Sequence, residues 1–235
     1  MKSFWKIISS IFFTLTALIA IFELFRCGQF VFNSCKTGDY FGYIFLAAGL
    51  LLYFIVERLF FRKNLDILQT MSHEGAHMLV GGLFLRRRIY EFHAKSKDSM
   101  APDESNLGFV TIGTKNPNIL FYLAPYTLPY LTYILLLIRL MIKDECLPII
   151  DVIIGITLMF YLKVWKKDTR FDQTDLKTCG IFRSVVFIIT FVIFNISIIL
   201  YSMGSVQKAP INVIDAFVMY FKQFYNDILW LISLF

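Results

Sequence analysis

The stretch Ser72–Gly82, SHEGAHMLVGG, lies inside a longer apolar run from Leu65 to Leu85 that is long enough for a membrane-spanning helix. Two of the chain's 3 histidines fall in this stretch, and a glutamate directly follows the first of them. An ionisable side chain at the centre of a membrane helix costs about 2.5–3.5 kcal/mol on insertion scales, so such residues usually belong to a site or a pathway. The combination predicts a membrane helix that carries a functional polar cluster.

His73, Glu74 and His77 match the pattern H-E-x-x-H. Residues four apart lie one above the other on a helix, so both imidazoles can bind one zinc ion at about 2.0–2.1 Å. Glu74 lies beside them, where it can take a proton from a water and pass it to a leaving amine. We interpret the three residues as a hydrolytic zinc site that lacks its third protein ligand. Two alternatives stay open: a polar cluster that only joins helices, and an ion-binding or transport site.

The rest of the chain has the composition of a membrane protein. Of its 235 residues, 57% are hydrophobic and only 17% are charged, whereas soluble domains are usually about a quarter charged. Apolar runs of about 20 residues, enough to cross a bilayer, predict an all-α polytopic protein with about six transmembrane helices. These runs lie near residues 7–25, 41–61, 65–85, 119–142, 148–164 and 182–203.

Three further segments complete this organisation. The polar insertion 86–117 contains NLGFVTIG, a β-branched and aromatic run with glycines, which predicts a short strand or hairpin after the motif helix. A second polar insertion, Lys166–Gly180, separates the last two runs. Segment 211–235 has polar residues at near-helical spacing, which predicts a helix in the membrane interface or packed on the bundle. We therefore divide the chain into N-terminal transmembrane helices (1–64), a catalytic core (65–205) and a C-terminal interfacial or transmembrane helix (206–235).

The charged residues indicate which partners to expect, and the cysteines indicate which metal sites to expect. The net charge of +6 comes from basic residues just beyond the apolar runs, which is typical of contact with lipid headgroups and not with nucleic acid. Lysine and arginine are more frequent after the first, third and fifth runs, which places those loops in the cytoplasm and the N-terminus outside. No CxxC pair occurs, so a thiolate zinc site is not expected and the thiols are predicted to be unpaired. The cysteines are Cys27, Cys35, Cys146 and Cys179.

A zinc ion with two histidine ligands commonly takes a carboxylate as its third. Four acidic residues are better explained as solvated charges or helix caps: Glu91, Glu104, Glu145 and Asp151. Asp175 lies closest to the apolar run that starts after Gly180, where a carboxylate can turn inward, so it is our predicted ligand. Asp172 is the second candidate. Asp168 follows two lysines and is interpreted as an ordinary solvated charge.

Four pieces of the sequence carry a family resemblance over residues 65–205. They are HEGAH (73–77), LGFVTIG (107–113), LAPYTLPYLTY (123–133) and QTDL (173–176). With these pieces the chain resembles the site-2 protease family of intramembrane zinc metalloproteases, in particular its compact bacterial members. The setting of the late aspartate differs, because many members have Asn-Pro-Asp-Gly or Leu-Asp-Gly where this chain has QTDL.

The resemblance implies a three-helix core in which His73, His77 and a late aspartate hold zinc and Glu74 activates water. It also implies that an edge strand aligns an unfolded substrate segment by main-chain pairing. The expected activity is hydrolysis of peptide bonds within or near the membrane, with a membrane protein or a membrane-tethered peptide as substrate. The expected location is a bacterial inner membrane. A membrane metal-binding or transport protein and a catalytically silent scaffold are the alternatives, and the sequence predicts no oligomeric state.

Overall fold

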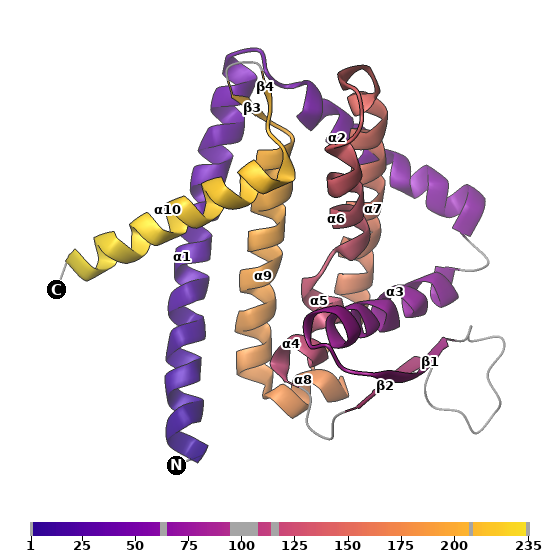
Figure 1. The fold of residues 1–235 in the computed structure, drawn as a ribbon, viewed down its shortest axis with the longest axis vertical. Coiled ribbons are helices and arrows are strands. Elements are labelled where there is room, and N and C mark those ends of the chain that lie inside the picture. The colour runs from indigo at the N-terminus through magenta and orange to yellow at the C-terminus, as the bar shows by residue number, and fades with distance from the viewer. Residues whose placement is uncertain (1, 62–64, 95–107, 114–117, 207–208, 234–235) are drawn as a thin grey trace.

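The computed structural model describes residues 2–61, 65–94, 108–113, 118–206 and 209–233 (Figure 1). This part of the chain is mainly helical, and four of its helices are long and apolar enough to cross a membrane. The four lie in α1 (Lys2–Lys36), in α2 (Phe41–Val56) with its π-helical extension Glu57–Phe61, in α7 (Leu147–Asp168) with the 3-10 turn Asp144–Cys146 before it, and in α9 (Ile181–Ser202). The predicted mainly helical fold with apolar helices of membrane-spanning length is thereby confirmed, whereas the count of about six spans is not.

The motif helix covers almost all of the predicted span 65–85, but its last turn is not a regular α-helix. It consists of α3 (Leu65–Leu79) and a π-helical turn, Val80–Phe84. In Figure 1, α3 runs across the direction of α7 and α9, at the end of the bundle that also holds α8 and the strands β1 and β2. Many of its side chains are polar, which favours the end of a bundle over contact with lipid tails. These residues are Asp66, Gln69, Thr70, Ser72, His73, Glu74 and His77.

The predicted span 119–142 is broken into three helices. These are α4 (Ile119–Tyr122), α5 (Ala124–Thr127) and α6 (Tyr130–Arg139). Proline lacks an N–H and forces the residue before it out of helical geometry. Accordingly, Leu128 before Pro129 is extended (φ −122°, ψ 100°), and Pro125 lies at the start of α5. The two prolines therefore break a segment that the hydropathy pattern alone predicts to be one continuous helix.

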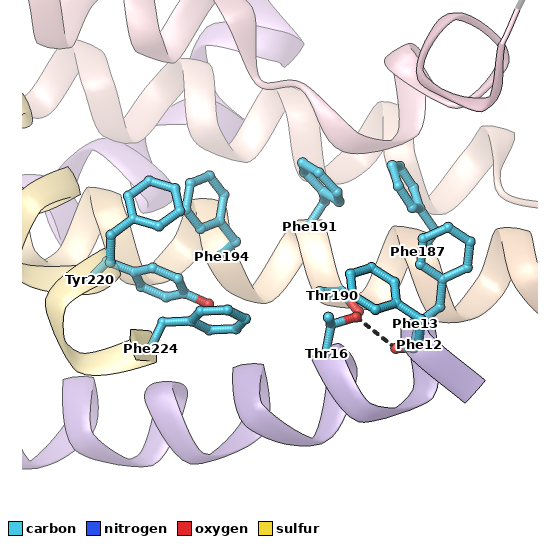
Figure 2. Close-up of a pocket in the computed structure, with 10 residues that line it drawn as sticks. Phe12, Phe13, Thr16, Phe187, Thr190, Phe191, Phe194, Tyr220 and Phe224 are labelled. Carbon is cyan, nitrogen blue, oxygen red and sulfur yellow. Dashed lines mark hydrogen bonds between the residues drawn. The ribbon is translucent and has the colours of Figure 1, made fainter. Parts of the chain in front are cut away.

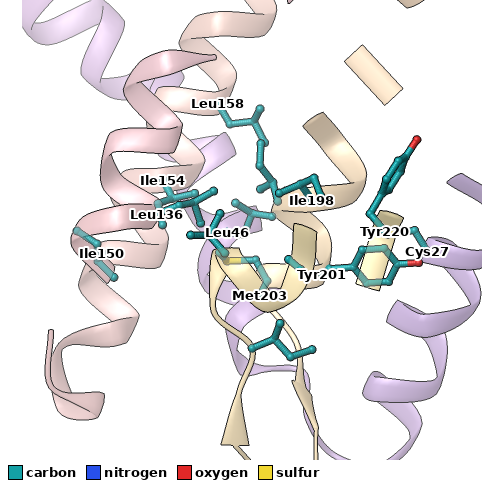
Figure 3. Packing of buried hydrophobic residues seen from close by; sticks show 14 of the residues in the cluster. Cys27, Leu46, Leu136, Ile150, Ile154, Leu158, Ile198, Tyr201, Met203 and Tyr220 are labelled. Carbon is teal, nitrogen blue, oxygen red and sulfur yellow. The ribbon is translucent and has the colours of Figure 1, made fainter. Parts of the chain in front are cut away.

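Close helix contacts hold the bundle together. Helix α2 packs along α7, and α1 packs along α9. A Cβ atom at Gly49 of α2 would overlap the backbone of Val152, and one at Gly155 of α7 would overlap that of Leu46. Small residues at such positions let two membrane helices approach closely. Buried side chains from several helices fill the centre of the bundle, among them Leu46, Leu136, Ile154, Ile198 and Tyr201 (Figure 3).

The C-terminal segment forms one helix, α10 (Val213–Ser233), which packs on α9 and α1 and lies across both in Figure 1. A helix packed on the bundle was one of the two arrangements predicted for this segment. Helices α1, α9 and α10 together line a partly open apolar cavity of about 310 Å³, with aromatic rings as most of its lining (Figure 2).

A buried ion pair joins α6, α7 and the segment before α10. Arg139 Nε donates to Asp151 Oδ1 at 2.7 Å, and Arg139 Nη1 donates to the carbonyl of Ile211 at 3.2 Å. Asp151 is only 2% exposed. The prediction that Asp151 stabilises a helix start is therefore wrong, because its buried carboxylate forms an ion pair with the guanidinium of Arg139.

Two strands follow the motif helix, as predicted for the first insertion. Strands β1 (Ile89–Ala94) and β2 (Gly108–Ile112) are antiparallel, with Phe92 opposite Val110. A second, very short pair, β3 (Ser205–Val206) and β4 (Ala209–Pro210), was not predicted.

Glu91 and Glu145 are exposed, as expected for solvated charges, whereas Glu104 lies outside the described residues. All 4 cysteines are free.

Candidate metal centre

One face of α3 presents both histidines of the motif toward the middle of a polar cavity. The centroids of the His73 and His77 rings are 5.2 Å apart. The cavity has a volume of about 620 Å³, and residues from α3, β2, α4, the end of α7 and α8 line it. Side chains that are far apart in the sequence therefore meet beside the H-E-x-x-H turn.

Each imidazole is oriented by a hydrogen bond at its Nδ1 atom. His77 Nδ1 lies 2.7 Å from the carbonyl oxygen of Phe121, and His73 Nδ1 lies 2.9 Å from Asp168 Oδ2. A carbonyl and a carboxylate only accept, so both Nδ1 atoms carry the proton. The Nε2 atoms are then the ring nitrogens that face Asp175, where each can bind a proton or a metal ion. A donor bond from the second ring nitrogen to a carboxylate or a carbonyl is the usual outer support of a metal-binding histidine.

Pro125 explains why the Phe121 carbonyl is available. In a regular helix this oxygen would accept from the N–H four residues later. That residue is Pro125, which has no N–H. The break between α4 and α5 thus supplies a free acceptor, which His77 uses.

Both Nε2 atoms face the same carboxylate. Asp175 Oδ2 lies 3.5 Å from His77 Nε2 and 3.9 Å from His73 Nε2. Asp175 lies in the first turn of α8 (Thr174–Cys179), the helix that leads through Gly180 into α9. Gly180 has a φ of 90°, which is the left-handed region that glycine adopts without strain. Leu176 and Cys179 of α8 are buried, and this anchoring fixes the carboxylate beside the histidines.

The three side chains form a donor set that could hold a metal ion. One ligand atom from each of His73, His77 and Asp175 lies within 4.8 Å of the others. Around a tetrahedral zinc ion with ligands at about 2.0–2.2 Å, neighbouring ligand atoms are about 3.3 Å apart. Small side-chain movements close that difference. Two imidazoles and one carboxylate are a common catalytic zinc set, although the same set also suits iron, cobalt and nickel.

The charges around the cluster favour a cation between the rings. Burial alone would raise the pKa of Asp175, but its interactions with His73 and His77 lower it to about 2. Burial likewise opposes the charge on His73, yet its contacts with Asp168 and Asp175 raise its pKa to about 9. The two carboxylates therefore make this space attractive to positive charge, whether that charge is a proton or a metal ion.

Glu74 lies beside the cluster and against the start of β2. Its side chain is buried, and burial raises its pKa. A Cβ atom at Gly108 would lie 2.7 Å from Glu74 Cγ and 2.9 Å from Glu74 Oε1. Strand β2 thus lies close against the motif glutamate, and a larger residue than glycine at position 108 would force the side chain of Glu74 or Thr70 to shift.

The other candidates take different places. Asp172, the second choice for the third ligand, has 68% of its side chain exposed and lies 3.6 Å from Arg170 Nε, so the structure does not bring it to the cluster. His93 lies on β1, stacked on Phe109 of the paired strand. The interpretation of Asp168 as a solvated charge is wrong. Its side chain is only 20% exposed because the last turn of α7 packs on α3, where Lys167 Nζ donates to Gln69 Oε1.

Three features of the site were missed from the sequence. Asp168 supports His73, the Phe121 carbonyl supports His77, and Gly108 makes room for Glu74. Pro125 was the one local signal, since a proline four residues after an apolar residue leaves a carbonyl without its helical partner. Nothing local marks Asp168, because its role depends on how α7 and α3 meet.

Replacing Asp168 by alanine is expected to weaken zinc binding by about 10–100-fold, which is the usual effect of losing an outer-shell carboxylate. His73 would lose the partner that fixes its tautomer and ring orientation. Competition with a chromogenic chelator measures the affinity. Asp172→Ala is the matched control, because it removes an exposed aspartate from the same loop. Equal affinities of the two variants would contradict the assigned role of Asp168.

Comparison of the chain with family models, with curated proteins and with solved structures gives no match. The functional argument therefore depends on the residues and geometry of the site.

Proposed function

We propose that this chain is an integral membrane zinc metallopeptidase that hydrolyses peptide bonds at the membrane. One observation carries the proposal: the Nε2 atoms of two histidines in an H-E-x-x-H turn face one buried aspartate, while both Nδ1 atoms are held by acceptors. A polar cluster that only joins helices would not need two ring nitrogens directed at one carboxylate. The resemblance to site-2 proteases supports the same activity.

In this proposal His73, His77 and Asp175 hold the zinc ion. When bound, zinc supplies Lewis-acid chemistry, which polarises the scissile carbonyl and makes water more acidic. Glu74 takes the proton from the attacking water on its carboxylate and delivers it to the leaving amine. Burial of Glu74 raises its pKa toward neutrality and makes it a better base for this transfer. Asp168 and the Phe121 carbonyl keep the histidine rings in position throughout.

The strand β2 is the proposed docking edge for the substrate. Its residues Gly108, Phe109 and Val110 line the cavity together with Glu74. An extended peptide can pair with an exposed strand edge through its main chain. This pairing requires an unfolded segment, because helical carbonyls are already bonded within the helix.

The site lies at the ends of the membrane-spanning helices. Asp168 is the last residue of α7, and Asp175 lies just before the start of α9. Cleavage is therefore proposed near one membrane face, on a membrane protein or a membrane-tethered peptide. We further propose that α4, α5 and α6 together form a fifth crossing, that α3 lies at this face, and that the membrane is a bacterial inner membrane.

Gly108→Ala is expected to lower the cleavage rate by at least 10-fold while zinc content stays at the wild-type level. The added methyl group would displace Glu74, which contacts the Cβ position at 2.7 Å, and a small misplacement of a catalytic group is costly. The rate on a peptide substrate and the zinc content of the same sample test this. Gly113→Ala is the control, because a Cβ there meets its nearest atom at 3.4 Å. A normal rate for Gly108→Ala would contradict the placement of Glu74.

The experiment that tests the function uses the purified chain in lipid vesicles with a membrane-tethered peptide. Cleavage is expected, its loss on treatment with a chelator is expected, and added zinc should restore it. Chelator treatment should leave the helical circular dichroism signal unchanged, which separates loss of the metal from unfolding. Cleavage that persists after complete removal of metal would contradict the proposal.

A further inference from the structure

A second buried polar cluster lies away from the metal centre, where α10 crosses α1. Glu23 of α1 is 0% exposed and Asp227 of α10 is 6% exposed. Glu23 lies within Ile7–Lys36, the part of α1 that is long and apolar enough to cross a membrane. Ionisable residues within such a helix are costly and usually mark an ion or proton site.

One arginine bridges the two carboxyl groups. Arg26 Nη1 lies 3.2 Å from Glu23 Oε1, and Arg26 Nη2 lies 2.5 Å from Asp227 Oδ1. The second oxygen of each group, Glu23 Oε2 and Asp227 Oδ2, is buried and has no hydrogen-bond partner. The shared guanidinium therefore brings the two carboxyl groups to one place in the protein.

The charges in this cluster do not balance. Among the described residues Arg26 is the one cation that faces the pair, so two carboxylates and one guanidinium leave a net charge of −1. Neighbouring titratable groups are neutral thiols and phenols, which add no positive charge. They are Cys27 of α1, Tyr201 of α9 and Tyr220 of α10, shown in Figure 3. An uncompensated charge away from water is strongly unfavourable, so the cluster needs one more positive charge.

A proton fits this need better than a metal cation. Hard cations such as calcium and magnesium take about six or more oxygen ligands, whereas this cluster offers two free carboxyl oxygens. A single proton on either of these oxygens removes the excess negative charge and turns one unpaired acceptor into a donor.

We propose that Glu23 and Asp227 share one proton at neutral pH and form a proton-binding site that holds α10 on α1. Loss of this proton leaves two carboxylates that repel each other and weakens the contact between the two helices. Helix α10 also supplies Tyr220, Phe221 and Phe224 to the aromatic cavity between α1 and α9 (Figure 2). Proton release at this site would therefore loosen one wall of that cavity.

Infrared spectroscopy of the purified full chain tests the proposal, because a protonated carboxyl group has its own carbonyl band. The measurement is made in the Glu74→Gln background, which removes a buried carboxyl group whose pKa is raised by burial. Asp151 is also buried, but its two oxygens accept from the Arg139 guanidinium, so it is not expected to hold a proton. At neutral pH one such band is expected. It should disappear in Glu23→Gln and in Asp227→Asn, since either change removes the shared proton. Asp215→Asn is the control, because Asp215 is an exposed carboxylate in the first turn of α10.

Two results would overturn the proposal. One is the absence of a protonated carboxyl band at neutral pH in the Glu74→Gln protein, which requires neither Glu23→Gln nor Asp227→Asn to fold. The other is a thermal stability that depends on sodium concentration and not on pH, which would assign the site to a metal cation. The expected pattern is the reverse. The folded chain binds one proton more than the unfolded chain, so its stability falls as pH rises, and this slope should be smaller in Glu23→Gln.

Discussion

Glu74→Gln is expected to lower peptide cleavage by about 10²–10⁴-fold, the usual contribution of a positioned general base, while zinc content stays at the wild-type level. Glutamine has the shape of glutamate but cannot accept the proton of the attacking water. The glutamate does not belong to the group of His73, His77 and Asp175 that fits a metal ion. The change should therefore separate the chemistry from metal binding.

The raised pKa of Glu74 predicts how the cleavage rate changes at acidic pH. Burial raises the pKa of Glu74 above 4.5, the ordinary value for glutamate. A base must be ionised to act, so activity should fall as pH decreases through this raised pKa. The control is Glu57→Gln, which removes a carboxylate that pairs with Lys163 at 2.6 Å, outside the site. Full activity of Glu74→Gln would refute the proposed mechanism.

Asp175→Ala is expected to abolish cleavage and to weaken zinc binding. The loss of affinity should exceed the 10–100-fold that is typical of removing a residue which only supports a metal ligand. Within the described part of the chain, Asp175 is the carboxylate that faces both Nε2 atoms, at 3.5 and 3.9 Å. Its removal would leave only two protein ligands, where catalytic zinc usually has three. Chelator competition and cleavage assays on the same preparation measure both effects.

Asp172→Ala is the matched control for this prediction. Asp172 is three residues earlier, has the same side chain and is 68% exposed. It should retain the zinc affinity and the cleavage rate of the wild type. If Asp172→Ala lost zinc and Asp175→Ala kept it, the ligand assignment would be reversed.

The core of the site was predictable because its spacing is local. His73, Glu74 and His77 lie within one turn and a half of helix, so helix geometry alone brings them together. Asp175 was predicted from its position before an apolar run, and the structure places it against both histidines. Asp168 was misinterpreted because its lysine neighbours suggested a solvated loop. The packing of α7 on α3, which local sequence does not encode, turns this side chain inward.

The membrane topology was predictable only where hydropathy is uninterrupted. Helices α1, α2, α7 and α9 follow directly from long apolar runs. The run 119–142 has the same composition, yet Pro125 and Pro129 divide it into α4, α5 and α6. The run 65–85 was interpreted as a span despite its polar residues, and those residues now explain why α3 lies at the end of the bundle. Mean hydropathy shows neither the helix breaks at the prolines nor the effect of the polar residues in α3.

The central claim is that His73, His77 and Asp175 bind one metal ion. The most direct test is the zinc content of the purified wild type beside that of the Asp175→Ala and Asp172→Ala variants, measured by elemental analysis after dialysis. One zinc ion per chain is expected in the wild type and in Asp172→Ala, with little or none in Asp175→Ala. An Asp175→Ala protein that keeps a full zinc ion, or a wild type that binds none, would contradict the account.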